Sequence, residues 1–412
     1  MKKACIISVG NELLNGHTVD TNAAYLSGEL FSTGIPVGGV YTVGDDIVSI
    51  LRAMNLAAGD ADVVLMTGGL GPTDDDITRQ VFAKFLGREL EFHEELFEKI
   101  EDFFVRRSLK MPEKNRIQAY IPAGAKAIAN DVGTAPGIMA GLKDKLFFAM
   151  PGVPFEMKKM FKESVLPELE RFGQGQAVAV KKLRCFGAGE STIAEMMGDM
   201  MMRGRNPLIN CTVSYGVITL HIIAEAEDKA KALKMAEDDE RRLRGILGEL
   251  IYGTGEQSLG EVVGQELARQ HKTIATAESC TGGLLAKLIT DIPGASKYFL
   301  QGLVTYSNSA KIKELGVSAE LIEKYGAVSE EVSASMAGGV RKTAGTDFAI
   351  GITGIAGPDG GSEEKPVGLV YISVDCGRGC ETRRFIFSGD REFIRFRAAQ
   401  TALNMVRLRL KT

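Results

Sequence analysis

The stretch DVVLMTGGLGPTDDD, residues 62–76, decides the fold of the first part of this chain, together with the helical pattern ITRQVFAKFL that follows it at 77–86. Its apolar beginning, residues 62–67, predicts a buried strand, and the glycines after it predict a tight loop. Apolar residues then recur at helical spacing. Strand, loop and helix in this order are typical of a βαβ unit in a parallel sheet.

The same alternation is found on the N-terminal side of this stretch. A strand pattern at 4–9 precedes a helical pattern at 21–31. A second strand pattern at 36–43 precedes a helical pattern at 47–58. Repeated units of this kind predict a parallel sheet covered by helices on both faces. We therefore expect a three-layer α/β/α domain over residues 1–172, with its ligand site at the carboxyl ends of the strands.

The rest of the chain predicts two further units, so the fold class is multidomain α/β. Gly173–Gln176 has the composition of a linker and opens a small α+β connector over 173–253. A capping box at Ser258–Glu261 begins a third unit, an α/β domain over 254–412. The connector is expected to have strands near 177–185 and 217–226 and helices near 191–202 and 228–247. The third unit is expected to have strands near 273–277, 298–305, 347–352, 368–374 and 382–387 and helices near 282–290, 330–344 and 391–410.

The composition is that of an ordinary globular protein. The 412 residues are 45% hydrophobic and 25% charged, and the formal net charge is 49 − 53 = −4. Such a charge offers no basic footprint for nucleic acid or for an anionic membrane. No apolar run approaches the roughly 18 residues of a membrane span. Small soluble ligands are therefore the expected partners, and neither a membrane nor a nucleic acid is expected.

The cysteine and histidine content narrows the chemistry further. Six cysteines without a C-x-x-C spacing predict reduced thiols and a cytoplasmic location. The four histidines are scattered and have no zinc spacing. The connector holds 11 Lys and Arg and 11 Asp and Glu. This balance favours a role as a spacer or dimerisation unit over RNA binding.

A candidate nucleophile, Ser279, lies in the loop 277–283 between a predicted strand and a predicted helix. The N–H groups and the positive end of a helix dipole can hold an oxyanion or a phosphate there. A serine hydroxyl also needs a base. Lys311 can serve if burial or a neighbouring cation lowers its pKa, and Tyr306 can relay the proton. Cys280 is the rival nucleophile, although one residue along a helical turn points it about 100° away.

A third loop, Thr353–Gly361, begins where another predicted strand ends. Taken alone, each of these residues is better explained by a structural role: Ser279 as a helix cap, Cys280 as a buried thiol and Lys311 as a solvated charge. Three glycine-bearing loops at strand ends in one domain instead predict the walls of a nucleotide-sized pocket.

The N-terminal loop Thr67–Asp76 combines glycines with three consecutive acids. Its backbone amides can cradle a diphosphate, and the adjacent carboxylates can hold a divalent ion. Helix capping explains one aspartate but not three. The pair Asp45-Asp46 ends the neighbouring strand, so carboxylates from two strand ends can converge. Gly133–Gly137 supplies another tight loop.

The motifs of the third unit resemble, in order, those of the C-terminal domain of the CinA family. The residues that carry this resemblance, within 255–410, are 277–283, 305–308 with Lys311, 353–358, 365–368 and 391–403. The resemblance implies hydrolysis of nicotinamide mononucleotide to nicotinate mononucleotide and ammonia, without a metal or other cofactor. It implies that Ser279 is the nucleophile, Lys311 its base and Tyr306 an assisting hydroxyl. Arg391, with Arg395 as the fallback, would meet the 5′-phosphate. The other implied substrate contacts are Thr281, Gly282, Gly283, Thr353, Gly354 and Gly357.

Residues 3–170 are similar to the molybdopterin-binding fold that precedes this domain in full-length CinA proteins. The motifs that carry the similarity are 10–12, 67–76 and 151–157. The resemblance implies hydrolysis of ADP-ribose to AMP and ribose 5-phosphate, with a divalent metal of the Mg or Co type. Asp45 and Asp76 correspond to the acidic pair of the family, and Asp75 and Glu12 are weaker metal-ligand candidates. The implied nucleotide contacts are Asn11, Thr67, Gly68, Gly69, Gly71 and Thr134.

Two classes of function follow from these expectations. The first is an enzyme of pyridine nucleotide salvage with two nucleotide substrates. Members of the family are often dimers, so the resemblance also implies a homodimer. The competing class is a non-catalytic nucleotide-binding or partner-binding protein of competence and DNA repair, in which either pocket binds without turnover.

Overall fold

The computed structural model describes residues 2–172 and 177–411. The chain divides into two compact units, one made of residues 1–179 with 224–234 and the other of 180–223 with 235–412. The expected linker Gly173–Gln176 lies outside the described residues. In the described part of the chain, no helix combines the length and the apolar character needed to cross a membrane.

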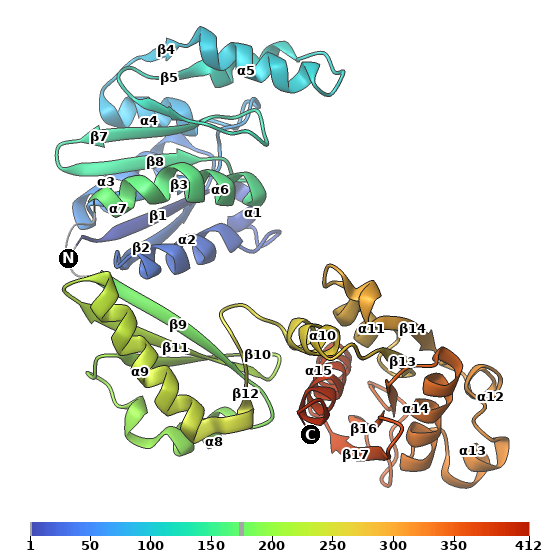
Figure 1. The fold of residues 1–412 in the computed structure, drawn as a ribbon. Coiled ribbons are helices and arrows are strands. Elements are labelled where there is room, and N and C mark those ends of the chain that lie inside the picture. The colour runs from blue at the N-terminus through green and yellow to red at the C-terminus, as the bar shows by residue number, and fades with distance from the viewer. Residues whose placement is uncertain (1, 173–176, 412) are drawn as a thin grey trace. The chain divides into compact units, whose positions relative to one another are not determined.

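The N-terminal domain is built on a six-stranded sheet of order β2-β1-β3-β8-β7-β6 (Figure 1). Its strands are β1 (Ala4–Val9), β2 (Val37–Val43), β3 (Val63–Thr67), β6 (Lys126–Ile128), β7 (Gly137–Leu142) and β8 (Lys145–Met150). The first four in spatial order are parallel, so the loops that follow β1, β2, β3 and β8 meet at one edge.

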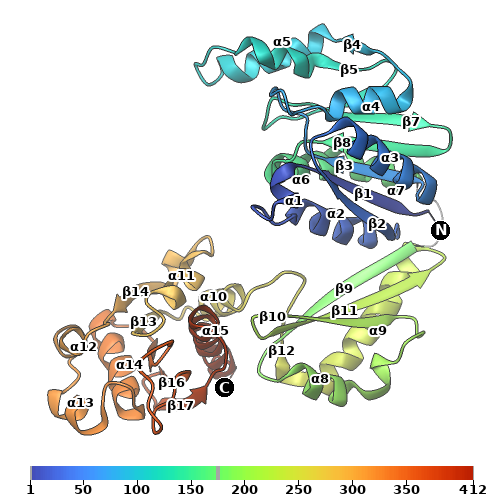
Figure 2. The same ribbon diagram turned by 180° about the vertical axis from the view of Figure 1, so that it is seen from behind.

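Helices cover both faces of this sheet (Figure 2). One face carries α3 (Ile47–Asp60) and α4 (Thr78–Leu86). The other carries α2 (Thr21–Ser32), α6 (Pro154–Met160) and α7 (Leu166–Phe172), the last two joined by a π-helical turn at Phe161–Val165. A short α1 (Asn11–Leu14) follows β1. The three-layer α/β/α prediction is therefore confirmed.

The sequence patterns were wrong about strand direction at one side of this sheet. β7 runs antiparallel to both β8 and β6, so the sheet is mixed rather than parallel. The physical reason is the tight turn between β7 and β8, because a short turn can join only antiparallel strands. The patterns also missed the pair β4 (Leu90–Phe92) and β5 (Tyr120–Pro122), with α5 (Glu94–Val105) and the 3₁₀ helix Glu113–Ala119 between them.

The connector contains a four-stranded sheet of order β10-β11-β9-β12. Its elements are β9 (Ala177–Cys185), α8 (Glu190–Met197), β10 (Leu208–Ser214), β11 (Val217–Ala226), α9 (Lys229–Leu247) and β12 (Ile251–Thr254), with 3₁₀ turns at Gly198–Met201 and Gly248–Leu250. The expectation placed two strands here and missed β10 and β12. The prediction of a small α+β unit is otherwise confirmed.

The C-terminal domain has a five-stranded mixed sheet of order β14-β13-β15-β16-β17. Its strands are β13 (Ile274–Glu278), β14 (Phe299–Val304), β15 (Phe348–Gly354), β16 (Leu369–Asp375) and β17 (Cys380–Ile386). β13 is parallel to both of its neighbours, β14 and β15, whereas β16 is antiparallel to both of its neighbours, β15 and β17. The loops that follow β13, β14 and β15 therefore meet at one edge.

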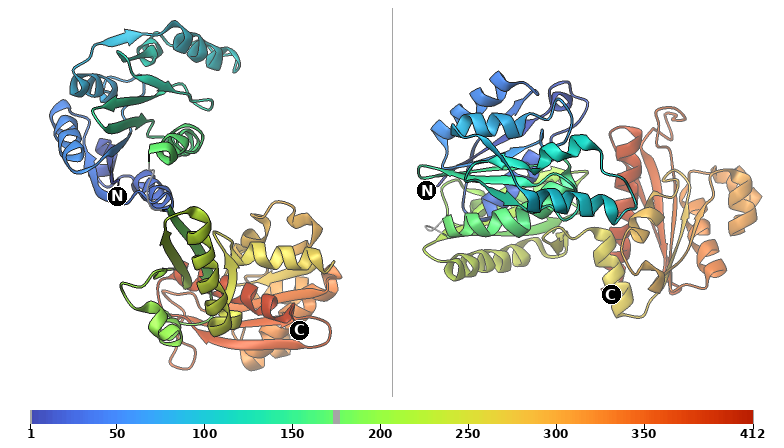
Figure 3. Two further views of the ribbon diagram at one scale, coloured as in Figure 1. Left: turned by 60° about the vertical axis from the view of Figure 1, so that its left-hand side comes forward. Right: turned by 90° about the horizontal axis from the view of Figure 1, so that it is seen from above.

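Helices also cover both faces of the C-terminal sheet (Figure 3). One face packs against α10 (Leu259–Arg269), α11 (Leu284–Thr290) and α15 (Arg391–Arg409), and the other against α12 (Asn308–Leu315), α13 (Ala319–Tyr325) and α14 (Glu330–Ala344). A short 3₁₀ turn spans Ala295–Lys297. The predicted capping box is confirmed, because the Ser258 hydroxyl accepts from the Glu261 N–H while the Glu261 carboxylate accepts from the Ser258 N–H.

Candidate functional site

Ser279 comes directly after β13, a strand whose five residues are all buried. Its backbone N–H donates to the carbonyl oxygen of Ile352 at 3.0 Å, which ties the start of the loop to β15. Gly282 and Gly283 have positive φ angles of 58° and 90°, a conformation that favours glycine and turns the chain into α11. The side chain of Ser279 is therefore held at the strand-end edge of the sheet.

Lys311 reaches this serine from α12. The helix is capped by Ser307, whose hydroxyl accepts from the Ala310 N–H. Lys311 is only 1% exposed, and its Nζ lies 3.0 Å from Ser279 Oγ. The same nitrogen donates to the carbonyl oxygens of Thr305 at 2.8 Å and Tyr306 at 3.2 Å. The structure thus joins the loops after β13 and β14 through one amine.

The environment of Lys311 favours its neutral form. Burial lowers the pKa of Lys311 below its ordinary value, and Cys280 opposes this shift. A neutral amine has two hydrogens and one lone pair. Nζ donates to Ser279 Oγ as well; once the amine is neutral, the two carbonyl oxygens, which can only accept, can take both hydrogens and leave the lone pair for Ser279 Oγ. This arrangement can receive a proton from the serine hydroxyl.

Cys280, the rival nucleophile, is buried at 5% exposure. Burial raises the pKa of Cys280 to about 12. Because the thiolate is the reactive form of cysteine, this thiol is inert near neutral pH.

Tyr306 and Arg391 form a separate group at the rim. The hydroxyl of Tyr306 accepts a hydrogen bond from Arg391 at 3.1 Å, and Arg391 also donates to the carbonyl oxygen of Gly357 at 2.8 Å. Within residues 2–172 and 177–411, the Tyr306 hydroxyl has no hydrogen bond to Ser279 or Lys311. Arg395 donates to the carbonyl oxygen of Thr281 at 2.7 Å. Arg391 and Arg395 of α15 therefore brace loops of the site.

The remaining candidate substrate contacts differ in availability. Thr353 is 1% exposed and its hydroxyl donates to the carbonyl oxygen of Ala327, so that group is already engaged. Thr281 is fully buried, and its hydroxyl has no hydrogen-bond partner among the described residues. Gly354 ends β15, where a side chain would collide with the backbone of β16.

A buried carboxylate that the sequence patterns did not single out organises the serine loop. Glu278 is 1% exposed and accepts from the backbone N–H groups of Gly283, Leu285 and Ala286, at 3.0, 3.0 and 2.8 Å. It thereby satisfies the N-terminal amides of α11, which have no partners inside the helix. In the sequence, Glu278 could have been recognised as an acid at the end of a predicted buried strand, immediately before a glycine-containing turn.

Replacing Glu278 by glutamine should destabilise the C-terminal domain by about 1–3 kcal/mol, because an amide has one acceptor oxygen for three buried N–H donors. Differential scanning calorimetry of the full chain should show this as a lower midpoint for the C-terminal transition. Glu323→Gln changes an exposed carboxylate in the same domain and should have almost no effect. Equal midpoints for the two variants would contradict the anchoring role of Glu278.

The N-terminal domain has its own cavity, of about 390 Å³, at the edge where β1, β2, β3 and β8 end. The predicted residues that line it are Glu12, Asp45, Gly68, Gly69, Gly71, Asp75, Asp76 and Thr134. Asn11 and Thr67 do not line it. The backbone N–H of Asn11 donates to the Asp45 carboxylate at 2.9 Å, and Thr67 is buried at the end of β3.

The carboxylates of this cavity repel one another. Partial burial raises the pKa of Asp45. The negative charges of Glu12, Asp75 and Asp76 raise this pKa further, whereas the hydrogen bond from the Asn11 N–H lowers it. In the described part of the chain, no three His, Cys, Asp or Glu side chains gather closely enough to hold a metal ion. Magnesium commonly uses one or two protein carboxylates and completes its coordination with water and phosphates. The acids therefore fit an ion shared with a phosphate ligand better than a closed protein cage.

Two features hold the glycine loop that carries these acids. Gly68 has a φ angle of 103°, and a side chain there would collide with the carbonyl oxygen of Val9. Arg79 on α4 is 1% exposed and donates to the carbonyl oxygen of Leu70 at 2.8 Å. Burial lowers the pKa of Arg79 to about 10, while Asp76 acts in the opposite direction. In the sequence, Arg79 could have been recognised as a charged residue on the apolar face of a short predicted helix.

These folds and cavities define a multidomain α/β protein that carries a molybdopterin-binding-type domain and a separate C-terminal α/β domain. The chain belongs to the CinA family. The CinA C-terminal domain matches residues 256–410, the probable molybdopterin binding domain matches 5–171, and the damage-inducible protein CinA KH domain matches 180–253.

Relatives along the whole chain agree with this assignment. A CinA-like protein of Kosmotoga olearia is 44% identical over 405 residues, covering 98% of each chain. A protein of Clostridium acetobutylicum whose name describes it as competence-damage inducible is 42% identical over 405 residues, again covering 98% of each. The solved structure of CinA from Thermoplasma acidophilum, described as of unknown function, is 36% identical and covers 41% of this chain and 96% of its own, with a TM-score of 0.38.

Proposed function

We propose that the C-terminal domain hydrolyses the carboxamide of nicotinamide mononucleotide to nicotinate mononucleotide and ammonia. The observation that carries this proposal is the 3.0 Å contact between the buried Lys311 Nζ and Ser279 Oγ. Family membership supports the substrate class. A serine hydroxyl in contact with a buried amine of lowered pKa offers the nucleophile and the base that amide hydrolysis by a serine requires.

In the proposed mechanism, Ser279 Oγ attacks the carboxamide carbon while Lys311 Nζ accepts the hydroxyl proton. The backbone N–H groups of Cys280 and Thr281, which follow Ser279 in the turn, would stabilise the oxyanion. Lys311 then returns the proton to the departing nitrogen, the C–N bond breaks and ammonia leaves. Water attacks the resulting ester, again with Lys311 as base, and releases the carboxylate and free Ser279.

In this proposal, Arg391 and Tyr306 lie at the rim of the deamidase site and bind or orient the nucleotide. Arg391 is held by two neutral oxygen acceptors, Tyr306 Oη and the Gly357 carbonyl, so its charge stays uncompensated by an acid in these contacts. A guanidinium in that state suits the 5′-phosphate of the substrate. Tyr306, whose side chain is exposed, assists by orienting Arg391 and the bound nucleotide.

We further propose that the N-terminal domain hydrolyses ADP-ribose to AMP and ribose 5-phosphate. Asp45 and Asp76 would hold a divalent metal of the Mg or Co type, with Asp75 and Glu12 as weaker candidates. That ion, when bound, neutralises charge that develops on the diphosphate. Gly69, Leu70 and Gly71 line the same cavity, and their amides would bind phosphate oxygens, whereas the Gly68 N–H already donates to the Met150 carbonyl oxygen.

The test of this second activity is AMP formation from ADP-ribose with added Mg²⁺. Asp76→Ala should reduce the rate by about 100-fold or more, since loss of a metal-ordering group commonly costs that much. Asp74→Ala is the matched control, because the Asp74 side chain is 93% exposed and pairs with Lys114 outside the cavity. Full activity in Asp76→Ala, or an equal loss in Asp74→Ala, would place the metal elsewhere.

The domain boundaries 1–172, 173–253 and 254–412, a cytoplasmic setting and a homodimer complete the proposal, with the connector as spacer or dimer contact. The six cysteines are free thiols, which suits a reducing compartment. The alternative, a nucleotide-binding or partner-binding protein of competence, is supported by the names of the relatives. It predicts nucleotide binding without ammonia or AMP release.

A further inference from the structure

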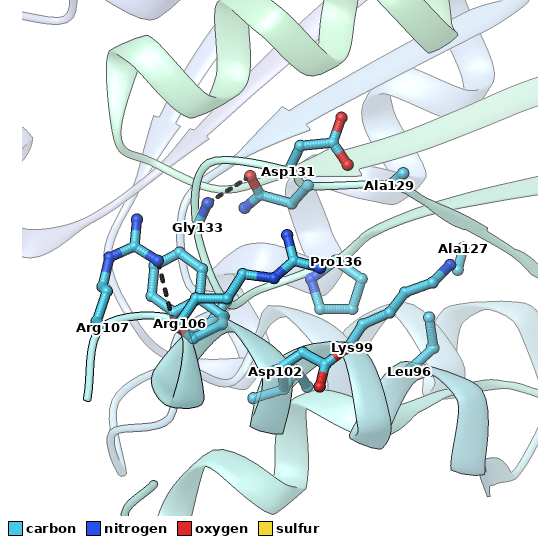
Figure 4. Close-up of a pocket in the computed structure, with 14 residues that line it drawn as sticks. Leu96, Lys99, Asp102, Arg106, Arg107, Ala127, Ala129, Asp131, Gly133 and Pro136 are labelled. Carbon is cyan, nitrogen blue, oxygen red and sulfur yellow. Dashed lines mark hydrogen bonds between the residues drawn. The ribbon is translucent and has the colours of Figure 1, made fainter. Parts of the chain in front are cut away.

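A second cavity in the N-terminal domain, of about 380 Å³, lies between α5 and the segment 127–136 (Figure 4). Its apolar part includes Ile100 and Phe103 of α5 and Pro136 across from them. Its polar part includes Lys99, Asp102 and Arg106 on the same helix and Asp131 across from them. A cavity of this volume, with an apolar floor and a few charged groups, matches the sites that proteins use for small ligands.

Lys99 and Arg106 have no ion pair within residues 2–172 and 177–411. The nearby Asp131 is engaged instead by Lys159, at 3.5 Å. Arg107 also lines the cavity, but its guanidinium lies 3.5 Å from the centre of the Phe103 ring and donates to the Phe103 carbonyl oxygen. The cavity therefore presents Lys99 and Arg106 without an ion-pair partner, together with the carboxylate of Asp102 on the same helix, beside an apolar surface.

The wall between this cavity and the acidic cavity is a braced loop, and Thr134 lines both. Asn130 Oδ1 accepts from the Gly133 N–H at 2.9 Å, and Asn130 Nδ2 donates to the Ala135 carbonyl at 2.9 Å and to Glu156 at 2.7 Å. A cationic cavity thus adjoins an acidic one across a single ordered loop.

We propose that this second cavity binds the nucleoside 5′-monophosphate portion of a nucleotide. The base lies on the apolar floor at Ile100 and Pro136, and the phosphate meets Lys99 and Arg106. Guanidinium and ammonium groups bind phosphate oxygens through charge-assisted hydrogen bonds. Without a bound metal, the acidic cavity repels an anion, so the cations across the loop supply the attraction. The identification of this nucleotide as AMP, a product of ADP-ribose hydrolysis, rests on the function proposed above, whereas its binding does not.

The experiment is calorimetric titration of the full chain with AMP, without added metal. The double variant Lys99→Ala/Arg106→Ala should bind AMP at least tenfold more weakly at one site, or lose that site from the stoichiometry. Lys110→Ala removes an exposed cation just beyond α5 that does not line the cavity, and it should bind as the native chain does. Asp76→Ala should retain AMP binding, because its change lies in the other cavity.

Adenosine separates the two parts of the cavity. It lacks the phosphate, so it should bind the native chain more weakly than AMP and should bind the double variant as well as the native chain. Unchanged AMP affinity in the double variant, or absence of AMP binding to the native chain, would overturn the inference. If ADP-ribose is not hydrolysed but AMP binding still depends on Lys99 and Arg106, the proposed activity fails while this site stands.

Discussion

Replacing Ser279 by alanine should reduce ammonia release from nicotinamide mononucleotide on the order of 10³-fold or more, because no other hydroxyl takes the place of a lost nucleophile. The Ser279 side chain is small and its backbone bond to Ile352 does not involve the hydroxyl, so the variant should fold normally. Coupled assay of ammonia with purified full chain, with nicotinate mononucleotide followed by chromatography, measures the effect.

Two further substitutions make the result specific. Thr343→Ala removes a hydroxyl on α14 that bonds only within its own helix, to the Gly339 carbonyl, and should leave the rate unchanged. Cys280→Ala removes the rival nucleophile and should keep most of the activity. If Cys280→Ala loses ammonia release while Ser279→Ala retains it, the nucleophile is the Cys280 thiol. Equal rates in all variants would remove the serine mechanism.

Lys311→Arg should also nearly abolish ammonia release, by about 10³-fold, although it keeps a long basic side chain at this position. A guanidinium stays protonated at any working pH and cannot accept the proton of Ser279. Lys311→Met, which fills the same volume without a base, should lose as much activity. Circular dichroism of both variants checks that they fold. Activity retained in Lys311→Arg would mean that Tyr306 or a water is the base.

The Lys311 amine should also determine how the rate of ammonia release depends on pH. Only the unprotonated amine accepts a proton, so kcat/KM should fall as the pH drops through the lowered pKa of Lys311 and should be level above it. Burial is the cause of the lowered pKa, so the fall should occur below the ordinary pKa of a lysine. A rate that rises continuously up to the ordinary lysine pKa would show that burial does not tune this group.

Much of this architecture can be predicted from the sequence because its signals are local. The apolar runs before Gly10, Gly68 and Ser279 are buried strands, and each is followed by the loop that the glycines indicate. Parallel strands place such loops at one edge, so candidate residues could be sought there before any distance was known.

Other features depend on contacts that no local pattern encodes. The meeting of Ser279 and Lys311 across 32 positions depends on how α12 is rotated about its axis. The role of Glu278 depends on which backbone amides fold back over it, and Arg391 turns out to contact Tyr306 and Gly357 rather than stand free. The cavity beside α5 was not foreseen, since α5 itself was not predicted.

The protonation state of Lys311 tests the central claim most directly. Nuclear magnetic resonance of full chain with isotopically labelled lysine side chains, with the signal assigned by its loss in Lys311→Arg, follows this amine as the pH changes. The account predicts a midpoint clearly below 10.5, the ordinary value for lysine, so that part of the population is unprotonated at working pH. A midpoint at or above that value would leave Ser279 without its base and would contradict the proposed hydrolysis.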